Sequence, residues 1–240
     1  MWLRLPTSVS EAQEFLSDGA VPIGGATLVW ATWQRDGFPD QAMSLRDLPE
    51  ANTVGRGTLG AAVVLHRIGD DVPEVLRQAA ATVGTGAVRR TATVGGNLVG
   101  STLRCLLPAA LVLDARATVL EPDRLYETDL AEVVAKRPLL LGLKWNDPSV
   151  SGYRKLAAEA GGPPPFVVAA AVHADADGQR LLRVAVRDGY EVLSETAPCG
   201  AGAEEAVEAL RRTDLGALDA TAWEAVREQV IDVLTRPSAG

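Results

Sequence analysis

The sequence predicts a folded protein that mixes helices and strands, and both its composition and its patterning support this fold class. Among its 240 residues, 47% are hydrophobic and 22% are charged, which is close to the average for globular proteins. Some segments repeat apolar residues at helical spacing, and others are short apolar runs between turn residues. We divide the chain into three parts, 1–52, 53–148 and 149–240, at turn-prone stretches.

The first part is expected to alternate helix and strand. Ser8 or Ser10 caps the first helix and Gly19 ends it, because serine accepts from helix N–H groups and glycine tolerates the turn that follows. A pair of glycines separates the first strand from the second helix. In order, the expected elements are a helix at 8–16, a strand at 20–23, a helix at 27–35 and a strand at 41–45.

The second part has a similar mixture around one unusual segment. Asp71 is the expected cap of a helix that has Pro73 near its first turn. Residues 84–98 hold too many glycines for a helix interior and are too patterned for a plain linker. The expected elements are a strand at 58–65, a helix at 73–83, a short helix at 108–113 and strands at 117–120 and 139–145.

The third part is expected to contain a strand pair followed by two helices. The turn-prone residues 175–178 join strands at 166–173 and 180–187. Apolar residues recur at helical spacing over 204–212 and 222–234, and residues 237–240 should fray.

Charge and cysteine content exclude several classes of function. The chain carries 31 acidic and 23 basic residues, a net charge of −8, so nucleic acid is not an expected partner. Cys105 and Cys199 lie far apart and form no Cys-x-x-Cys pair, so we expect no iron–sulfur or zinc ligand set. We find neither a secretory signal nor an apolar run long enough for a membrane span, and we therefore place the protein in the cytoplasm.

Two Gly-Gly pairs are the candidates for a binding site, one within residues 22–28 (PIGGATL) and one within residues 91–98 (TATVGGNL). Glycine permits a left-handed backbone and close approach to a ligand, and successive N–H groups with nearby threonine hydroxyls suit a diphosphate. Each pair alone could also be a simple tight turn. Neither matches the dinucleotide fingerprint G-x-G-x-x-G or the P-loop pattern.

These two segments resemble a known family. Residues 88–98 (VRRTATVGGNL), followed by 106–111 (LLPAAL), closely resemble the signature of the FAD-binding domain of molybdopterin dehydrogenases. Residues 23–28 resemble the family's first motif, A-G-G-T-D-L, and residues 59–61 resemble its middle I-G-A strand. The family includes the medium flavoprotein subunits of carbon monoxide dehydrogenase and of xanthine dehydrogenase-type hydroxylases.

The resemblance implies a PCMH-type (vanillyl-alcohol-oxidase-like) α+β fold, in which two subdomains hold FAD and a small third domain combines a sheet with helices. The residues implied to hold the diphosphate are Ile23, Gly24, Gly25, Ala26, Thr27 and Leu28 on one side and Thr93, Gly95, Gly96 and Asn97 on the other. Leu141 and Leu143 would flank the isoalloxazine. Lys155, in a Y-x-K string, would place a positive charge near the flavin, although it could equally be a solvated lysine.

The sequence departs from the family pattern at three places. No aspartate follows Thr27, and the loop 99–105 is a residue shorter, with Arg104 and Cys105 where the family has an acid. Glu159 replaces an arginine that usually follows the Y-x-K string. These departures affect the surroundings of the flavin.

Other polar or aromatic residues are expected to be structural. His66 and His173 have no second ligand at helical or strand spacing, so we interpret them as surface or hydrogen-bonded core histidines. Cys105 is expected to be a small core thiol. Trp30 and Trp33 are expected to pack within the first part rather than to form a substrate cage.

Three functions remain open at this stage. The first is an FAD subunit that relays electrons from the iron–sulfur clusters of partner subunits, beside a molybdenum subunit, to an acceptor. The second is a stand-alone FAD oxidoreductase that acts on a small organic substrate, which the altered loop 99–105 favours. The third is a binding or assembly protein of the same fold that has lost catalysis.

Overall fold

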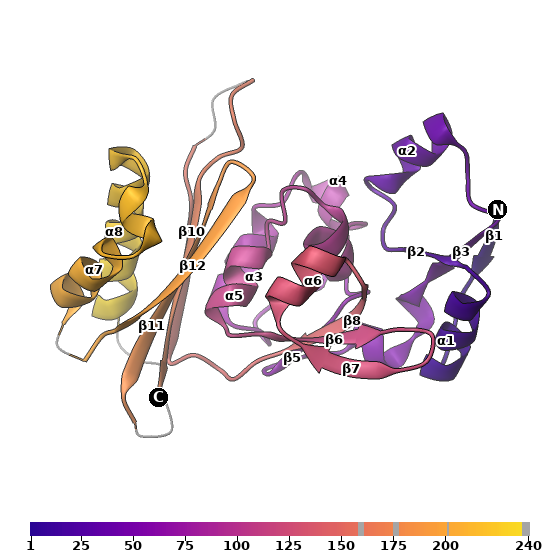
Figure 1. Ribbon diagram of the computed structural model, residues 1–240, viewed down its shortest axis with the longest axis horizontal. Helices are drawn as coiled ribbons and strands as arrows, with labels where there is room; N and C mark the ends of the chain where they lie inside the picture. Colours follow the sequence, from indigo (N-terminus) through magenta and orange to yellow (C-terminus); the bar gives the residue numbers. More distant parts are fainter. Residues whose placement is uncertain (158–160, 175–177, 201, 237–240) are drawn as a thin grey trace. The chain divides into compact units, whose positions relative to one another are not determined.

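The computed structural model describes residues 1–157, 161–174, 178–200 and 202–236, which form two compact units (Figure 1). The first unit contains Met1–Val72, Val83–Cys105 and Ala115–Trp145, and the second contains Pro73–Thr82, Leu106–Asp114 and Asn146–Gly240. Two segments from the middle of the chain therefore belong to the second unit. The three-part division at residues 52 and 148 remains a prediction.

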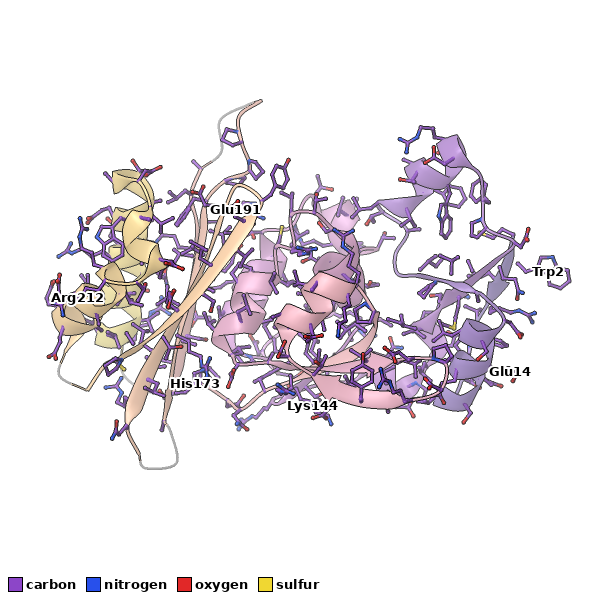
Figure 2. All side chains as sticks on the ribbon, viewed as in Figure 1. Trp2, Glu14, Lys144, His173, Glu191 and Arg212 are labelled. Atoms are coloured by element: carbon purple, nitrogen blue, oxygen red, sulfur yellow. The ribbon has the colours of Figure 1, made fainter. Side chains whose placement is uncertain are left out.

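The first sheet of the first unit is parallel, with the strand order β1-β3-β2. Its elements are β1 (Trp2–Arg4), α1 (Val9–Ser17), β2 (Val21–Ile23), α2 (Val29–Asp36) and β3 (Gln41–Ser44). Ser8 caps α1 by accepting from the N–H of Glu11 at 3.2 Å, as predicted. Trp2, at the edge of this sheet, is 73% exposed (Figure 2).

The second sheet of the first unit is antiparallel and has the order β4-β5-β8-β6-β7. Its strands are β4 (Val54–Gly55), β5 (Thr58–Gly60), β6 (Arg116–Leu120), β7 (Leu125–Thr128) and β8 (Leu139–Lys144). The helices α4 (Gly86–Arg89) and α6 (Leu130–Lys136) also belong to this unit. A shared core joins the two sheets, since Met43 and Leu48 from the first part pack with Leu120 and Leu141 from the second.

The second unit is a four-stranded antiparallel sheet with helices on both faces (Figure 1). Its strands, in the order β12-β11-β10-β9, are β9 (Val150–Lys155), β10 (Val167–Ala174), β11 (Arg180–Asp188) and β12 (Glu191–Pro198). The helices α7 (Ala203–Arg211) and α8 (Ala220–Thr235) cover one face, and α3 (Glu74–Ala81) and α5 (Leu107–Val112) cover the other. Valines at 226, 230 and 233, spaced at helical period, bury one face of α8.

The predicted strand at 58–65 is wrong beyond Gly60. Ala61, Val63 and Leu65 are buried while their neighbours are less so, which is the alternation expected of a strand. However, the N–H of Ala62 donates to the carbonyl of Ala51 and that of Val63 to the carbonyl of Gly60, so the backbone turns instead of extending the ladder. Beyond the turn, the segment bonds to residues 92–95: Val64 forms an isolated bridge with Thr93, and the N–H of Leu65 donates to the carbonyl of Ala92.

The glycine-rich segment 84–98 is more helical than predicted. Thr85 caps the short helix α4 by accepting from the N–H of Val88 at 3.3 Å, and Gly96–Gly100 forms a single π-helical turn. Pi-helical turns are often found at functional sites. Glycine content alone was thus a poor guide to this segment.

Several further boundaries differ. The helix α2 begins at Val29 rather than at residue 27, and Pro73, not Asp71, is the cap residue of α3. The strands β1, β4, β7, β9 and β12 and the helix α6 were not predicted. The strand pair β10–β11 and the helices α5, α7 and α8 are confirmed within two residues at each end. The predicted fraying tail at 237–240 lies outside the described residues, and so do positions 175–177 of the predicted turn at 175–178.

Trp30 and Trp33 pack within the first part, as predicted, but against Phe38 at the surface and not in the buried core. The helix α2 has no buried residue, and Trp30 is 48% exposed. Both indole rings contact Phe38 in edge-to-face geometry, with centroid distances of 5.2 and 6.2 Å. No helix in the described ranges is both long enough and apolar enough to cross a membrane.

Candidate functional site

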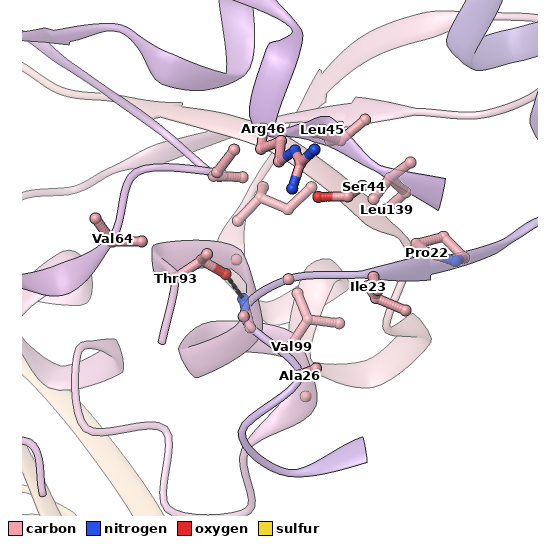
Figure 3. A pocket seen from close by; sticks show the side chains of 18 of the residues that line it. Pro22, Ile23, Ala26, Ser44, Leu45, Arg46, Val64, Thr93, Val99 and Leu139 are labelled. Carbon is pink, nitrogen blue, oxygen red and sulfur yellow. Dashed lines mark hydrogen bonds between the residues drawn. The ribbon is translucent and has the colours of Figure 1, made fainter. Parts of the chain in front are cut away.

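A cavity of about 630 Å³ lies within the first unit and is lined by both glycine loops (Figure 3). Its other walls are the residues that follow β3, those that follow β5 and those that begin β8. The strands β2 and β3 are parallel, with Ile23 opposite Ser44, so their carboxyl ends open at the same edge of the sheet. This is the usual place for a ligand in sheets with parallel strands.

The first glycine loop lies directly on the second. A Cβ atom on Gly25 would lie 1.7 Å from the carbonyl oxygen of Thr91, and a Cβ atom on Gly24 would lie 2.4 Å from Thr93 Oγ1. Neither glycine has a positive φ angle, contrary to the left-handed backbone that we expected at these pairs. The glycines are required here because only a residue without a side chain permits the contact between the two loops.

The residue with a left-handed backbone in the first loop is Ala26, with φ of 55°. An L-residue other than glycine in this region carries a conformational cost of about 1–2 kcal/mol. Such strain is often found at ligand-binding segments.

The two loops differ in how their backbone donors are used. The N–H of Gly95 donates to Ala61 O at 2.8 Å, and the N–H of Gly96 donates to Thr93 Oγ1 at 3.1 Å (Figure 3). Within the described residues, by contrast, no acceptor is found for the N–H groups of Gly24, Gly25 or Ala26. The first loop therefore has N–H groups that can donate to an anion. The second loop contributes part of the cavity wall and the hydroxyl of Thr93.

Seven of the predicted site residues line the cavity: Ile23, Gly24, Gly25, Ala26, Thr93, Gly95 and Gly96. Thr27 and Leu28 do not line it and are exposed, between the loop and the first turn of α2. Asn97 is buried within the π-helical turn, and Leu141 and Leu143 are buried core residues of β8. The cavity is thus formed by part of the predicted set.

Lys155 belongs to the second unit, where its Nζ donates to the carbonyl of Thr82 at 3.0 Å. In the same unit, the hydroxyl of Tyr153 lies 3.3 Å from Thr82 Oγ1. Glu159 lies outside the described residues. The proposed role of Lys155 at the flavin stays a prediction.

None of the described histidines and cysteines lines the cavity. His66 is exposed, and His173 is partly buried with its Nε2 2.8 Å from the carbonyl of Val112. Burial is the main cause that lowers the pKa of His173, which favours the neutral ring. Cys105 and Cys199 are buried, and neither forms a disulfide among the described residues.

Sequence reasoning missed three arginines, Arg46, Arg90 and Arg137, which also line the cavity. Among the described residues that line the cavity, these three are the only charged ones, and none of the lining residues carries a carboxylate. Arg90 could have been found, since it belongs to the second glycine motif. Arg46 follows β3 and Arg137 precedes β8, so only the packing of the two sheets shows that both line one cavity.

The loop 99–105 adds further positive charge to this region. Arg104 has a φ angle of 39°, and its buried Nε atom has no hydrogen-bond partner among the described residues. Burial, and then the charge of Arg137, lower the pKa of Arg104. The guanidinium of Arg104 therefore lies close enough to that of Arg137 for electrostatic repulsion.

The cavity fits the cofactor that the resemblance implies. Free backbone N–H groups, a threonine hydroxyl and arginines suit a diphosphate, while Leu45, Val64 and Leu139 provide apolar wall for ring systems. The lining thus combines an anion-binding region with apolar surface, as an FAD molecule requires.

Structural comparison shows the same fold in solved enzymes. A chain of the Cu,Mo-CO dehydrogenase in its cyanide-inactivated form matches with a TM-score of 0.72 and 17% identity, covering 98% of this chain and 96% of that one. A chain of reconstituted CO dehydrogenase from Oligotropha carboxidovorans matches with a TM-score of 0.69 and 19% identity, over 100% and 89% of the two chains. Quinoline 2-oxidoreductase from Pseudomonas putida 86 matches with a TM-score of 0.67 and 18% identity, over 98% and 95%.

Sequence comparison identifies the family. No curated protein sequence matches the chain significantly. Residues 2–140, more than half of the chain, match the family described as the FAD binding domain in molybdopterin dehydrogenase. FAD is the cofactor of that domain, and the PCMH-type α+β fold expected from the motifs is confirmed. The chain therefore belongs to the family of FAD-binding domains of molybdopterin dehydrogenases.

Proposed function

We propose that this chain is the flavoprotein subunit of a molybdenum hydroxylase, in which FAD passes electrons from the iron–sulfur clusters of a partner subunit to an acceptor. The observation that carries the FAD site is the first glycine loop, whose N–H groups at 24–26 lack acceptors within the described residues and whose residues line the cavity. In this proposal the loop holds the diphosphate, and the protein acts in the cytoplasm.

The assignment of a relay role rests on the matched enzymes. The chain aligns along nearly its whole length with chains of a Cu,Mo-containing CO dehydrogenase and of quinoline 2-oxidoreductase. Redox enzymes of this kind divide the chemistry among cofactors, and the protein around each cofactor controls its binding and its electrostatic surroundings. We therefore expect a molybdenum subunit and a [2Fe–2S] subunit as partners.

Flavin binding is tested first, with the full-length protein. After purification, the visible spectrum should show oxidised flavin, and the cofactor released by heat should be FAD. FMN should bind more weakly because it lacks the second phosphate and the adenosine. If apoprotein incubated with FAD acquires no flavin spectrum, or if FMN binds as tightly, the proposed site is wrong.

The relay role is tested with the native complex. Affinity purification from the host should recover partners whose metal analysis shows molybdenum and whose EPR spectrum shows a [2Fe–2S] cluster. Reduced partner should then reduce the FAD of this chain in a stopped-flow experiment. If the isolated chain is instead bleached anaerobically by a small organic compound, a stand-alone oxidoreductase replaces the relay.

Lys155 requires its own test, because its role was implied only by the Y-x-K string. If Lys155 stabilises the reduced flavin, Lys155→Met should lower the midpoint potential of the bound FAD, since a positive charge would be lost. An unchanged potential would leave Lys155 with only its hydrogen bond to Thr82.

A further inference from the structure

We propose that Arg46, Arg90 and Arg137 form the anion-binding wall of the cavity and hold the diphosphate of the dinucleotide together with the N–H groups of the first glycine loop. This inference rests on the proposed FAD site. It adds three side chains, from three different elements, to a site that the motifs describe only through glycines and threonines.

The charge distribution of the protein makes this set unusual. The whole chain has a net charge of −8, yet the charged residues that line the cavity are all arginines. A cavity wall with three positive charges and no carboxylate raises the local concentration of anions, because low-dielectric walls focus the field. The ligand expected from this lining is an anion with at least two charges, as a dinucleotide diphosphate is.

The arginines are also free to bind a ligand. Within the described residues, Arg90 and Arg137 form no ion pair or hydrogen bond through their guanidinium groups. Arg46 has only a loose, exposed pair with its neighbour Asp47, whose carboxylate lies 3.7 Å from Arg46 Nε. The charges of Arg104 and Arg137 repel each other. An anion would relieve this repulsion.

The fold directs two of these arginines toward the first glycine loop. The register that places Ile23 opposite Ser44 brings Arg46 to the same sheet edge as Gly25. Arg90 directly precedes Thr91, whose carbonyl oxygen lies against Gly25. Guanidinium groups bind phosphate in a bidentate manner, which backbone N–H groups cannot do, so the two kinds of donor complement each other.

The test is a binding titration of the full-length apoprotein with Arg46→Gln, Arg90→Gln and Arg137→Gln. FAD is followed by flavin fluorescence, and ADP, which has a diphosphate but no flavin, by calorimetry. Each substitution should weaken both ligands about tenfold or more, since one charge-assisted hydrogen bond is lost. Riboflavin, which has no phosphate, should bind equally to all variants.

A matched control is Arg56→Gln, because Arg56 is exposed in the same unit, does not line the cavity and forms no side-chain hydrogen bond or ion pair among the described residues. It removes the same charge and should leave both affinities unchanged. Added salt should weaken ADP binding to the wild type more than to Arg90→Gln. Salt screens the attraction between Arg90 and the phosphates, and the variant lacks that attraction. Arg90→Lys should restore part of the affinity.

The outcomes separate this inference from the proposed function. If wild-type protein binds FAD and all three variants bind FAD and ADP as tightly as the control, the arginine wall is wrong while the flavin site stands. If the variants lose FAD but not ADP, the arginines do not hold the diphosphate, and the inference fails. If wild-type protein binds neither ligand, the proposed function itself fails.

Discussion

The two glycine loops share a Gly-Gly pair with nearby threonines, yet the structure uses them differently. In the loop at 22–28, the glycines are needed so that the backbone can lie against Thr91, and their N–H groups have no acceptor among the described residues. In the loop at 91–98, the N–H groups of Gly95 and Gly96 are already bonded to Ala61 and Thr93. The N–H groups of Gly95 and Gly96 in the second loop thus stabilise the fold, and those of the first loop are available to a ligand.

This difference shows that a shared motif does not imply a shared role. Most buried backbone N–H groups donate a hydrogen bond to an acceptor within the protein. Only an N–H group that has no such acceptor can donate to a ligand. Separate substitutions can therefore test the contact between the loops, the hydrogen bonds within the second loop and the backbone strain in the first loop.

The largest effect is expected for Gly25→Val. Its Cβ atom would lie 1.7 Å from the backbone oxygen of Thr91, which cannot move aside as a side chain could. The loops must separate, so we expect loss of bound FAD and a decrease in stability of about 3 kcal/mol or more. Flavin content after purification and the thermal midpoint measure both effects.

Gly69→Ala is the control for this substitution, because Gly69 belongs to the same unit and a Cβ atom there would meet nothing within 4 Å. It should leave flavin content and thermal midpoint unchanged. Full flavin occupancy in Gly25→Val would show that contact between the loops is not needed for binding.

A smaller effect is expected for Gly96→Val in the second loop. Its Cβ atom would lie 3.0 Å from Thr93 Oγ1, a crowded contact with a side chain rather than with backbone. We expect a loss of about 1–3 kcal/mol of stability and a weaker, but measurable, affinity for FAD. Affinity lost as completely as in Gly25→Val would remove the distinction between the two loops.

Thr93→Val tests the internal bonding of the second loop. The substitution keeps the side-chain shape but leaves the N–H of Gly96 without its acceptor, which should cost about 1–3 kcal/mol on urea unfolding. Thr93→Ser retains the hydroxyl and should restore most of this stability. Equal stability of the valine and serine variants would show that the bond to Gly96 contributes nothing.

The smallest effect is expected for Ala26→Gly. Glycine relieves the left-handed strain at Ala26, while it also increases the entropy of the unfolded chain, so stability should change by less than about 1 kcal/mol. Ala26→Val should destabilise more, since a β-branched residue tolerates a positive φ poorly. If valine were accepted as well as glycine, the strain at Ala26 would have no influence on the loop.

Much of the fold could be predicted from local patterns. The strand pair β10–β11 was readable because each strand is an apolar run bounded by turn residues, and α8 because its valines recur at helical spacing. The strand predicted at 58–65 failed beyond Gly60, because the backbone turns there and residues 61–65 bond mainly to residues 92–95, with only an isolated bridge between Val64 and Thr93. Trp30 and Trp33 pack within the first part as predicted, but the sequence did not show that Trp30 stays 48% exposed, since hydrophobicity does not specify what covers a side chain.

The position of the glycine loops, the family of the chain and its cofactor FAD can be inferred from the amino-acid sequence alone, because these properties reside in short contiguous motifs. The folded chain is needed to show which N–H groups lack an acceptor among the described residues and that Arg46, Arg90 and Arg137 line one cavity. Hydrogen-bond pairing and charge proximity depend on contacts between segments far apart in the chain, and no local pattern encodes those contacts.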